Sequence, residues 1–199
     1  MGKERMLAFT DGVIAVIITI MVLELKPPSG TTLADLEHLW PVFLAYVMSF
    51  TYVGIYWNNH HHLYQLVERV SGGIMWANLH LLFWISLIPF ATAWVGEHEA
   101  DPWPTAVYGL SLLMAALSWW LMQTVIMRDQ GAASPLRTAV GWDWKGKLAP
   151  VFYAAGIGLS FVHVALADVA YAAVALLWLV PDRRMERMLS TTPSGGSPP

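Results

Sequence analysis

MLAFTDGVIAVIITIMVLEL, residues 6–25, is the stretch that decides the fold class. It is apolar along most of its length and exceeds the roughly 18 residues needed to cross a hydrocarbon core about 30 Å thick. It contains Asp11, ends near Glu24 and lacks a small-residue cleavage site, so it does not read as a signal peptide. The stretch therefore predicts a retained N-terminal transmembrane helix.

The rest of the chain repeats this character. Charged residues make up 13% of the sequence and hydrophobic residues 56%, whereas a soluble domain usually has about 25% charged residues. Pro and Gly clusters separate further apolar runs. We therefore expect an all-α integral membrane protein with one six-helix transmembrane domain over 1–189 and a disordered Ser/Thr/Gly/Pro tail over 190–199. The predicted helices are 4–25, 36–67, 72–96, 104–127, 146–164 and 167–181, with a turn over 163–168.

The distribution of Lys and Arg predicts the orientation. With the N-terminus in the cytoplasm, ten of the 11 Lys and Arg residues fall on the inner side and only Lys26 falls outside. Basic residues concentrate on the cytoplasmic side of membrane proteins, so both termini are expected to be cytoplasmic. The outer loops are acidic. They could concentrate cations, or they could simply be solvated; both explanations remain open.

Two polar islands interrupt the apolar helices. Asp11 lies in the first helix, and the run Trp57-Asn-Asn-His-His-His62 lies at a similar depth in the second. A charge at this depth normally faces protein, water or a partner. Asp11 could therefore bond to Trp57, Asn59 or His60, or it could be a headgroup-level acid near a helix start.

Several classes of chemistry are not indicated. Successive helical residues point about 100° apart, so three consecutive His cannot share one metal ion, and no metal site is predicted. The chain has no Cys, its net charge of −3 indicates no nucleic-acid partner, and no catalytic motif is recognised. No enzyme activity is therefore expected.

One face of the first helix carries Gly12, Val16, Thr19, Ile20 and Leu23 at helical spacing. An apolar stripe of this kind is typical of a helix-packing face and also fits the wall of a pore. No Thr-Val-Gly-Tyr-Gly segment occurs, so a carbonyl-ring potassium filter is not indicated. Periodicity alone leaves packing and pore lining open.

The run Arg5-x-x-x-Phe9-Thr10-Asp11 resembles the Arg-x-x-x-Phe-Ser-Asp signature of the transmembrane protein 175 family, which comprises lysosomal and bacterial potassium channels. The resemblance continues to Leu25 and resumes at 56–61, where the sequence reads Tyr-Trp-Asn-Asn-His-His. Thr10 replaces the usual serine and keeps the hydroxyl. The matching six-helix count extends the resemblance over roughly 4–181.

The resemblance implies a homotetramer in the bacterial inner membrane, with the first helix of each subunit lining a central pore for potassium ions. The resemblance implies that potassium is the permeant ion, that the lipid bilayer surrounds the protein and that no cofactor is bound. An aliphatic ring would form the constriction, narrowest at Ile20 or Leu23 because Val16 is small. The implied pore-lining residues are Val16, Thr19, Ile20 and Leu23. The implied bracing network comprises Arg5, Phe9, Thr10, Asp11, Trp57, Asn59 and His60.

Two other functions remain as alternatives. One is a proton- or cation-coupled secondary transporter in which Asp11 and His60 titrate, and the other is a non-conducting membrane scaffold. Transporters built from repeats carry matched breaks in corresponding helices. Only Pro89 is expected to interrupt a helix well inside this chain, so the sequence favours the channel.

Overall fold

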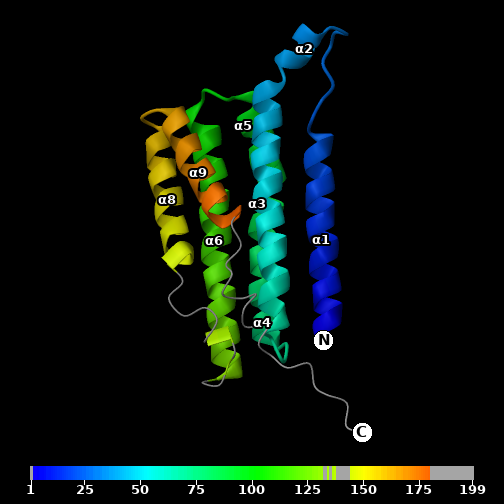
Figure 1. Ribbon diagram of the computed structural model, residues 1–199, viewed down its shortest axis with the longest axis vertical. Coiled ribbons are helices and arrows are strands. Elements are labelled where there is room, and N and C mark those ends of the chain that lie inside the picture. Colours follow the sequence, from blue (N-terminus) through cyan, green and yellow to red (C-terminus); the bar gives the residue numbers. More distant parts are fainter. Residues whose placement is uncertain (1, 132–133, 135, 138–143, 180–199) are drawn as a thin grey trace.

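In a computed structural model, the chain forms an elongated bundle of long helices (Figure 1). The structure describes residues 2–131, 134, 136–137 and 144–179; the predicted tail over 190–199 lies outside them. The helices of these described parts are α1 (Lys3–Leu23), α2 (Leu33–Glu37), α3 (Trp40–Gln65), α4 (Gly72–Ser86), α5 (Ile88–Glu97), α6 (Pro102–Gln130), α8 (Trp144–Ser160) and α9 (Val164–Leu179).

Helix α1 lies at one edge of the bundle and α8 and α9 lie at the other, with α3, α4, α5 and α6 between them (Figure 1). Helix α1 packs against α3, α4 and α5, whereas α6 packs most extensively against α8 and α4. The N-terminus, the α3–α4 junction and the end of α6 lie at the same end of the bundle. Helices α1 and α8 therefore lie at opposite edges of the bundle and contact different neighbours.

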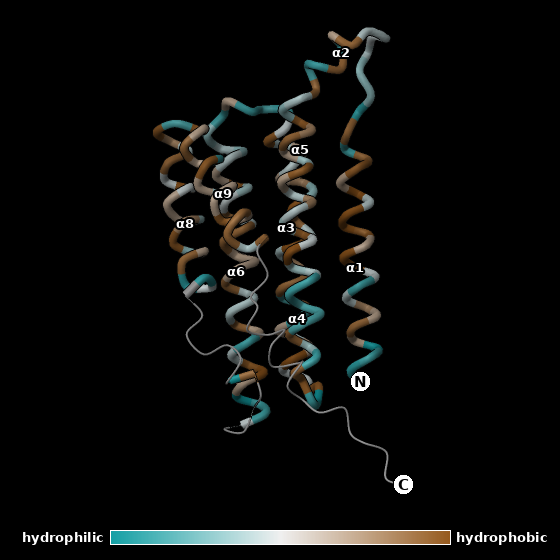
Figure 2. The backbone as a smooth tube through the Cα atoms, viewed as in Figure 1, coloured by the Kyte–Doolittle hydropathy of each residue, from teal (hydrophilic) through white to brown (hydrophobic). Residues whose placement is uncertain are grey.

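Three helical segments among the described residues are long and apolar enough to cross a membrane: Lys3–Leu23, Gly72–Glu97 and Pro102–Gln130. Helix α3 has 26 residues but is rich in aromatic and polar side chains, and α9 is apolar but shorter. Figure 2 shows hydrophilic residues gathered around α2 and at the lower ends of α3, α4 and α6. An apolar middle with polar ends is the pattern that a bilayer requires of a bundle that spans it.

Prolines explain two interruptions of the predicted helices. The predicted helix 36–67 is wrong at its start, because the short helix α2 ends at Glu37 and α3 begins at Trp40. Pro41 has no N–H to donate to the Glu37 carbonyl, so α2 cannot continue into α3. The interruption expected at Pro89 is observed, because the segment predicted as one helix over 72–96 is divided at Leu87.

Two further expectations at the C-terminal half are wrong. The last turn covers 161–163 rather than 163–168, because α8 is closed by hydrogen bonds from Val162 and His163 to the Leu159 carbonyl. Asp168 consequently lies inside α9 and not in a loop. Pro150 lies inside α8, so Pro89 is not the only internal proline.

One aromatic side chain of α9 makes close contacts with both α6 and α8. Tyr171 is completely buried, and its ring lies where Gly109 of α6 and Gly156 of α8 leave room. Its hydroxyl donates to the Thr105 carbonyl at 3.3 Å, and its own carbonyl accepts from the Tyr52 hydroxyl at 2.6 Å. Small residues that let helices approach closely are a common packing device in membranes.

Candidate functional site

Helix α1 has two faces with different surroundings. Its buried side carries Met6, Thr10, Ile14, Ile17 and Met21, which point into the bundle. These positions recur every three or four residues, as expected for one face of a helix. The rest of the helix surface is therefore available to lipid, to an aqueous pathway or to another subunit.

The predicted pore-lining residues lie on this other side of α1. Val16 is 55% exposed, Ile20 42% and Leu23 77%, and Thr19 is exposed as well. The Thr19 hydroxyl donates to the Val16 carbonyl of its own helix at 2.9 Å, so it is turned along the helix. The single chain thus leaves the whole stripe uncovered.

A groove of about 800 Å³ runs between this stripe and α5. It is strongly apolar, and the Pro89 interruption of the α4–α5 segment forms part of its wall. An apolar hollow next to an uncovered helix face needs lipid or protein to fill it. Among its lining residues are Phe9, Val16 and Ile20 of α1 and Pro89, Phe90 and Ala93 of α5.

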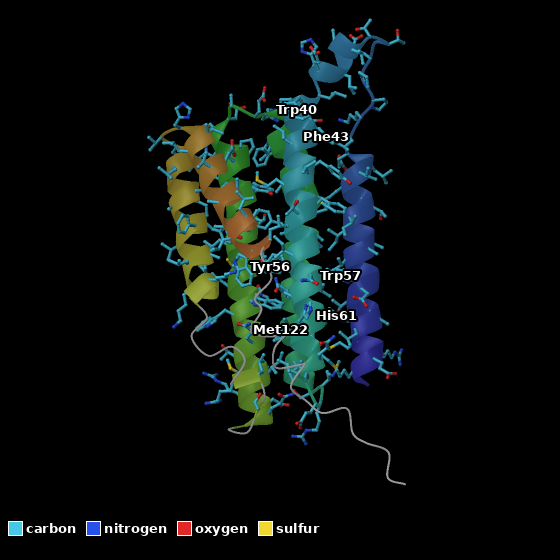
Figure 3. All side chains as sticks on the ribbon, viewed as in Figure 1. Trp40, Phe43, Tyr56, Trp57, His61 and Met122 are labelled. Atoms are coloured by element: carbon cyan, nitrogen blue, oxygen red, sulfur yellow. The ribbon has the colours of Figure 1, made fainter. Side chains whose placement is uncertain are left out.

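Two of the predicted network residues meet directly. Trp57 Nε1 donates a hydrogen bond to Asp11 Oδ1 at 3.0 Å, which links α3 to α1. Trp57 and His61 lie on the flank of α3 nearest α1, whereas Tyr56 lies on the opposite flank (Figure 3). Both Asp11 and Trp57 are exposed in the single chain, so this bond sits at the surface of the subunit.

A second connection is fully buried and runs through a residue that the sequence analysis missed. Asn78 of α4 donates from Nδ2 to Thr10 Oγ1 at 2.9 Å, and its Oδ1 lies 2.8 Å from His60 Nε2. Since Asn78 Oδ1 can only accept, His60 Nε2 carries the proton. One amide therefore ties α1, α3 and α4 together. A lone Asn in an apolar run is costly in a membrane, and this signal could have identified Asn78.

Three other predicted network residues do not join these contacts. Arg5 is exposed, and within the described part of the chain it forms no ion pair with Asp11. Phe9 is half exposed and lines the groove. Asn59 donates to the Ile55 carbonyl of its own helix at 2.9 Å and borders a small cavity with Tyr56 and Trp119. Asn59 thus faces α6 and not α1.

The consecutive His residues each have a different neighbour. His60 contacts Asn78, His61 Nε2 lies 3.0 Å from Gln65 Nε2, and His62 Nδ1 lies 2.7 Å from the Asn58 carbonyl. Among the residues that the structure describes, no group of three or more His, Cys, Asp or Glu side chains is arranged to hold a metal ion. The three imidazoles therefore have separate hydrogen-bond partners and do not converge on one shared site.

The segment that follows the C-terminal end of α1 carries an ion pair and a helix cap. Lys26 Nζ donates to Glu97 Oε1 at 2.8 Å, and this bond raises the pKa of Lys26 above its usual value. In the following loop, the Thr32 hydroxyl and backbone N–H donate to Asp35, and together they lower the pKa of Asp35. Both groups are consequently charged at neutral pH.

The sequence profile of the family described as Endosomal/lysosomal potassium channel TMEM175 matches residues 5–89. A potassium channel of Chryseobacterium sp. (strain P1-3) is 51% identical over 189 residues, covering 95% of this chain and 98% of that protein. A potassium channel of Streptomyces collinus is 33% identical and covers 87% and 90%.

A solved structure is similar over almost the same length. It is the crystal structure of a lysosomal potassium-selective channel TMEM175 homolog from Chamaesiphon minutus, with a TM-score of 0.79 and 27% identity. The alignment covers 89% of this chain and 96% of that one. The fold and the relatives thus point to the same family.

Proposed function

Because the chain belongs to the TMEM175 family of potassium channels, we propose that it is a potassium-permeable channel in which α1 of each subunit lines the pore. The observation that carries the proposal is the uncovered aliphatic stripe of α1, opposite the face that packs into the bundle. The family consists of channels, so no enzymatic activity is assigned.

The proposed assembly is a homotetramer around a central axis. Cyclic symmetry places one side chain of each subunit at the same height, so Ile20 and Leu23 would each form a four-membered aliphatic ring. Val16 would form a wider ring, with Thr19 supplying a hydroxyl between the rings. Such a constriction stops ions by excluding water. Potassium, which sheds its hydration water more readily than sodium, would be modestly preferred.

The proposed placement is the bacterial inner membrane, with six spanning segments and both termini in the cytoplasm. The described basic residues support this orientation, because Lys3, Arg5, Arg69 and Arg128 lie at the end of the bundle that carries the N-terminus. Lys26 lies at the opposite end, next to the end of α1. This asymmetry follows the bias of cytoplasmic loops toward Lys and Arg, and the relatives above are bacterial.

Reconstitution of the purified protein into planar bilayers under opposed potassium and sodium gradients tests the proposal. A channel gives a current whose reversal potential follows the potassium gradient and is unaffected by a pH gradient. Absence of current, or movement of potassium in fixed stoichiometry with protons, would contradict it. The second outcome would instead favour transport involving Asp11 and His60.

A further inference from the structure

The exposed stripe of α1 ends in a carboxylate. Glu24 caps the C-terminal end of α1, and it follows Val16 and Ile20 at intervals of four residues. Residues four apart lie on the same face of a helix, and all three side chains line the groove beside α5. Glu24 is exposed. The stripe therefore finishes, one turn beyond Ile20, in an acidic group at the end of the bundle opposite the N-terminus (Figure 1).

An acidic residue is unfavourable at this position of a helix. The last carbonyl groups of a helix carry partial negative charge, so cations stabilise this end and carboxylates destabilise it. The last turn of α1 holds no basic residue that would compensate. Within the described part of the chain, the Glu24 side chain forms no hydrogen bond or ion pair. Glu24 thus does not stabilise the helix that it ends, and such departures from local preference are expected at functional positions.

The basic residue two positions after Glu24 is held by a different carboxylate. Lys26 Nζ donates to Glu97 Oε1 at 2.8 Å, which links the segment after α1 to the end of α5. The pKa of Lys26 is raised first by this hydrogen bond, then by the charge of Glu97, and least by the charge of Glu24. The ammonium group therefore lies near Glu24 and pairs with Glu97, which leaves the Glu24 carboxylate without a counter-ion from Lys26.

We propose that Glu24 forms the outer charge of the pore, where one carboxylate from each subunit attracts cations before they reach the aliphatic rings. This inference rests on the proposed function, because the stripe must face the axis for the carboxylates to converge. Rings of Asp or Glu occur in cation channels, and converging charge of one sign raises the local concentration of the opposite ion. Such attraction is the same for all monovalent cations. Glu24 therefore sets how fast cations enter, whereas the aliphatic rings set which cations pass.

Bilayer recordings of the full chain in symmetrical potassium chloride test the inference. Glu24→Gln should lower the conductance by about twofold or more at about 0.1 M salt. The loss should be much smaller at about 1 M, because the screening length falls from about 10 Å to about 3 Å. Glu24→Asp, which keeps the charge, should conduct like the wild type. The reversal potential between potassium and sodium should be the same in all of these proteins.

The matched control is Glu99→Gln, which removes one carboxylate from the same end of the bundle. Glu99 lines a hollow together with Asp168 and Val169 of α9, at the edge opposite α1, so its loss should leave the conductance unchanged. An equal loss in Glu24→Gln and Glu99→Gln, or a loss in Glu24→Gln that is as large at about 1 M salt as at about 0.1 M, would overturn the inference.

A second variant tests the same charge without altering Glu24, and it decides the matter if Glu24→Gln does not fold. Glu97→Gln releases Lys26, which can then neutralise Glu24, so the conductance should fall at about 0.1 M salt. Lys26→Gln/Glu97→Gln removes the released ammonium group and should restore the conductance. Wild-type conductance in both Glu24→Gln and Glu97→Gln would overturn the inference and leave the proposed function intact. Absence of current from the wild type would overturn both.

Discussion

Asn78 joins polar side chains of α1 and α3 in a buried cluster that is separate from the surface pair of Asp11 and Trp57. It satisfies Thr10 and His60 at once inside the bundle, while Asp11 and Trp57 bond to each other at the surface. Buried polar groups without partners are expensive, so the inner cluster fixes the rotation of α1 relative to α3. The surface pair can be reached by a neighbouring subunit.

Asn78→Ala is expected to destabilise the protein by about 1–2 kcal/mol, because it leaves Thr10 and His60 without their shared buried partner. Asn59→Ala is the matched control, since the Asn59 amide bonds only its own helix, and it should cost much less. Unfolding followed by tryptophan fluorescence measures both. A smaller loss for Asn78→Ala than for Asn59→Ala would refute the bridging role.

Placing an amide side chain in the proposed aliphatic rings should open them to water. We expect Ile20→Asn and Leu23→Asn each to raise the leak current and to shift the reversal potential toward the value of an unselective pore, because a polar ring no longer excludes water. Bilayer recordings under the same gradients measure the effect. Val22→Asn, a substitution on the same helix outside the stripe, should leave selectivity unchanged; if all three variants behave alike, the stripe does not line the pore.

At the scale of elements, α9 is docked by the contact between Tyr171 and two glycines. A Cβ on Gly109 would lie 2.9 Å from Ile157 Cγ1 and against the Tyr171 hydroxyl. A Cβ on Gly156 would lie 2.9 Å from Tyr171 Cζ. By contrast, nothing lies within 4 Å of the corresponding position on Gly158. Of these two glycines of α8, only Gly156 therefore lies against the neighbouring helix.

Gly109→Ala and Gly156→Ala should each destabilise the protein by about 1–3 kcal/mol through overpacking against Tyr171. Gly158→Ala should be neutral or stabilise it by about 0.5–1 kcal/mol, because alanine is the better helix former. Thermal unfolding of the three variants in one detergent gives the comparison. Similar melting temperatures for all three would mean that α9 yields to the added methyl group.

Helix α2 depends on the charge of Asp35. Its pKa is lowered in the folded chain, so the cap stabilises α2 above the unfolded value of 3.8 and is lost as the pH falls through the lower folded value. Amide exchange over 33–37 at pH 5 should accelerate in Asp35→Ala, with Glu37→Ala unaffected. If Asp35→Ala exchanges at the wild-type rate, the cap does not hold this turn.

At the scale of the whole molecule, the proposed tetramer would cover the groove and the exposed stripe beside α1. In a bilayer such an association depends on close side-chain packing and polar contacts, because lipid tails are as apolar as the stripe itself. The opposite edge, with α8 and α9, would remain in lipid. The single chain is thus asymmetric, with one edge suited to the pore and the other to the bilayer.

Asp11→Ala is expected to weaken tetramer assembly more than it changes ion preference, because it removes the acceptor of the Trp57 bond at the edge of α1. Size-exclusion chromatography with light scattering, followed by bilayer recording, measures the two effects separately. His61→Ala, on the same flank of α3 (Figure 3), is the control for a general surface change. A stable tetramer with altered ion preference would contradict the bracing role.

The linear sequence determined what depends on local composition. Long apolar runs predict membrane helices, prolines predict where they end, and the motif at 5–11 together with the island at 57–62 indicates the family. Each of these signals is read along the chain, because hydrophobicity over about 20 residues suffices for membrane crossing. The helix boundaries at 36–40 and 161–168 were misplaced, since helix caps and proline geometry act over only a few residues.

Only the tertiary structure decided which face of each helix meets which neighbour. Helix α1 is apolar almost all around, so its periodicity does not distinguish the buried side, with Ile14 and Ile17, from the exposed side, with Ile20 and Leu23. The orientation of Asn59 away from α1 and the bridging role of Asn78 likewise depend on residues distant in sequence. Helix rotation is set by the side chains of the partner helices, and those contacts exist only once the helices have packed.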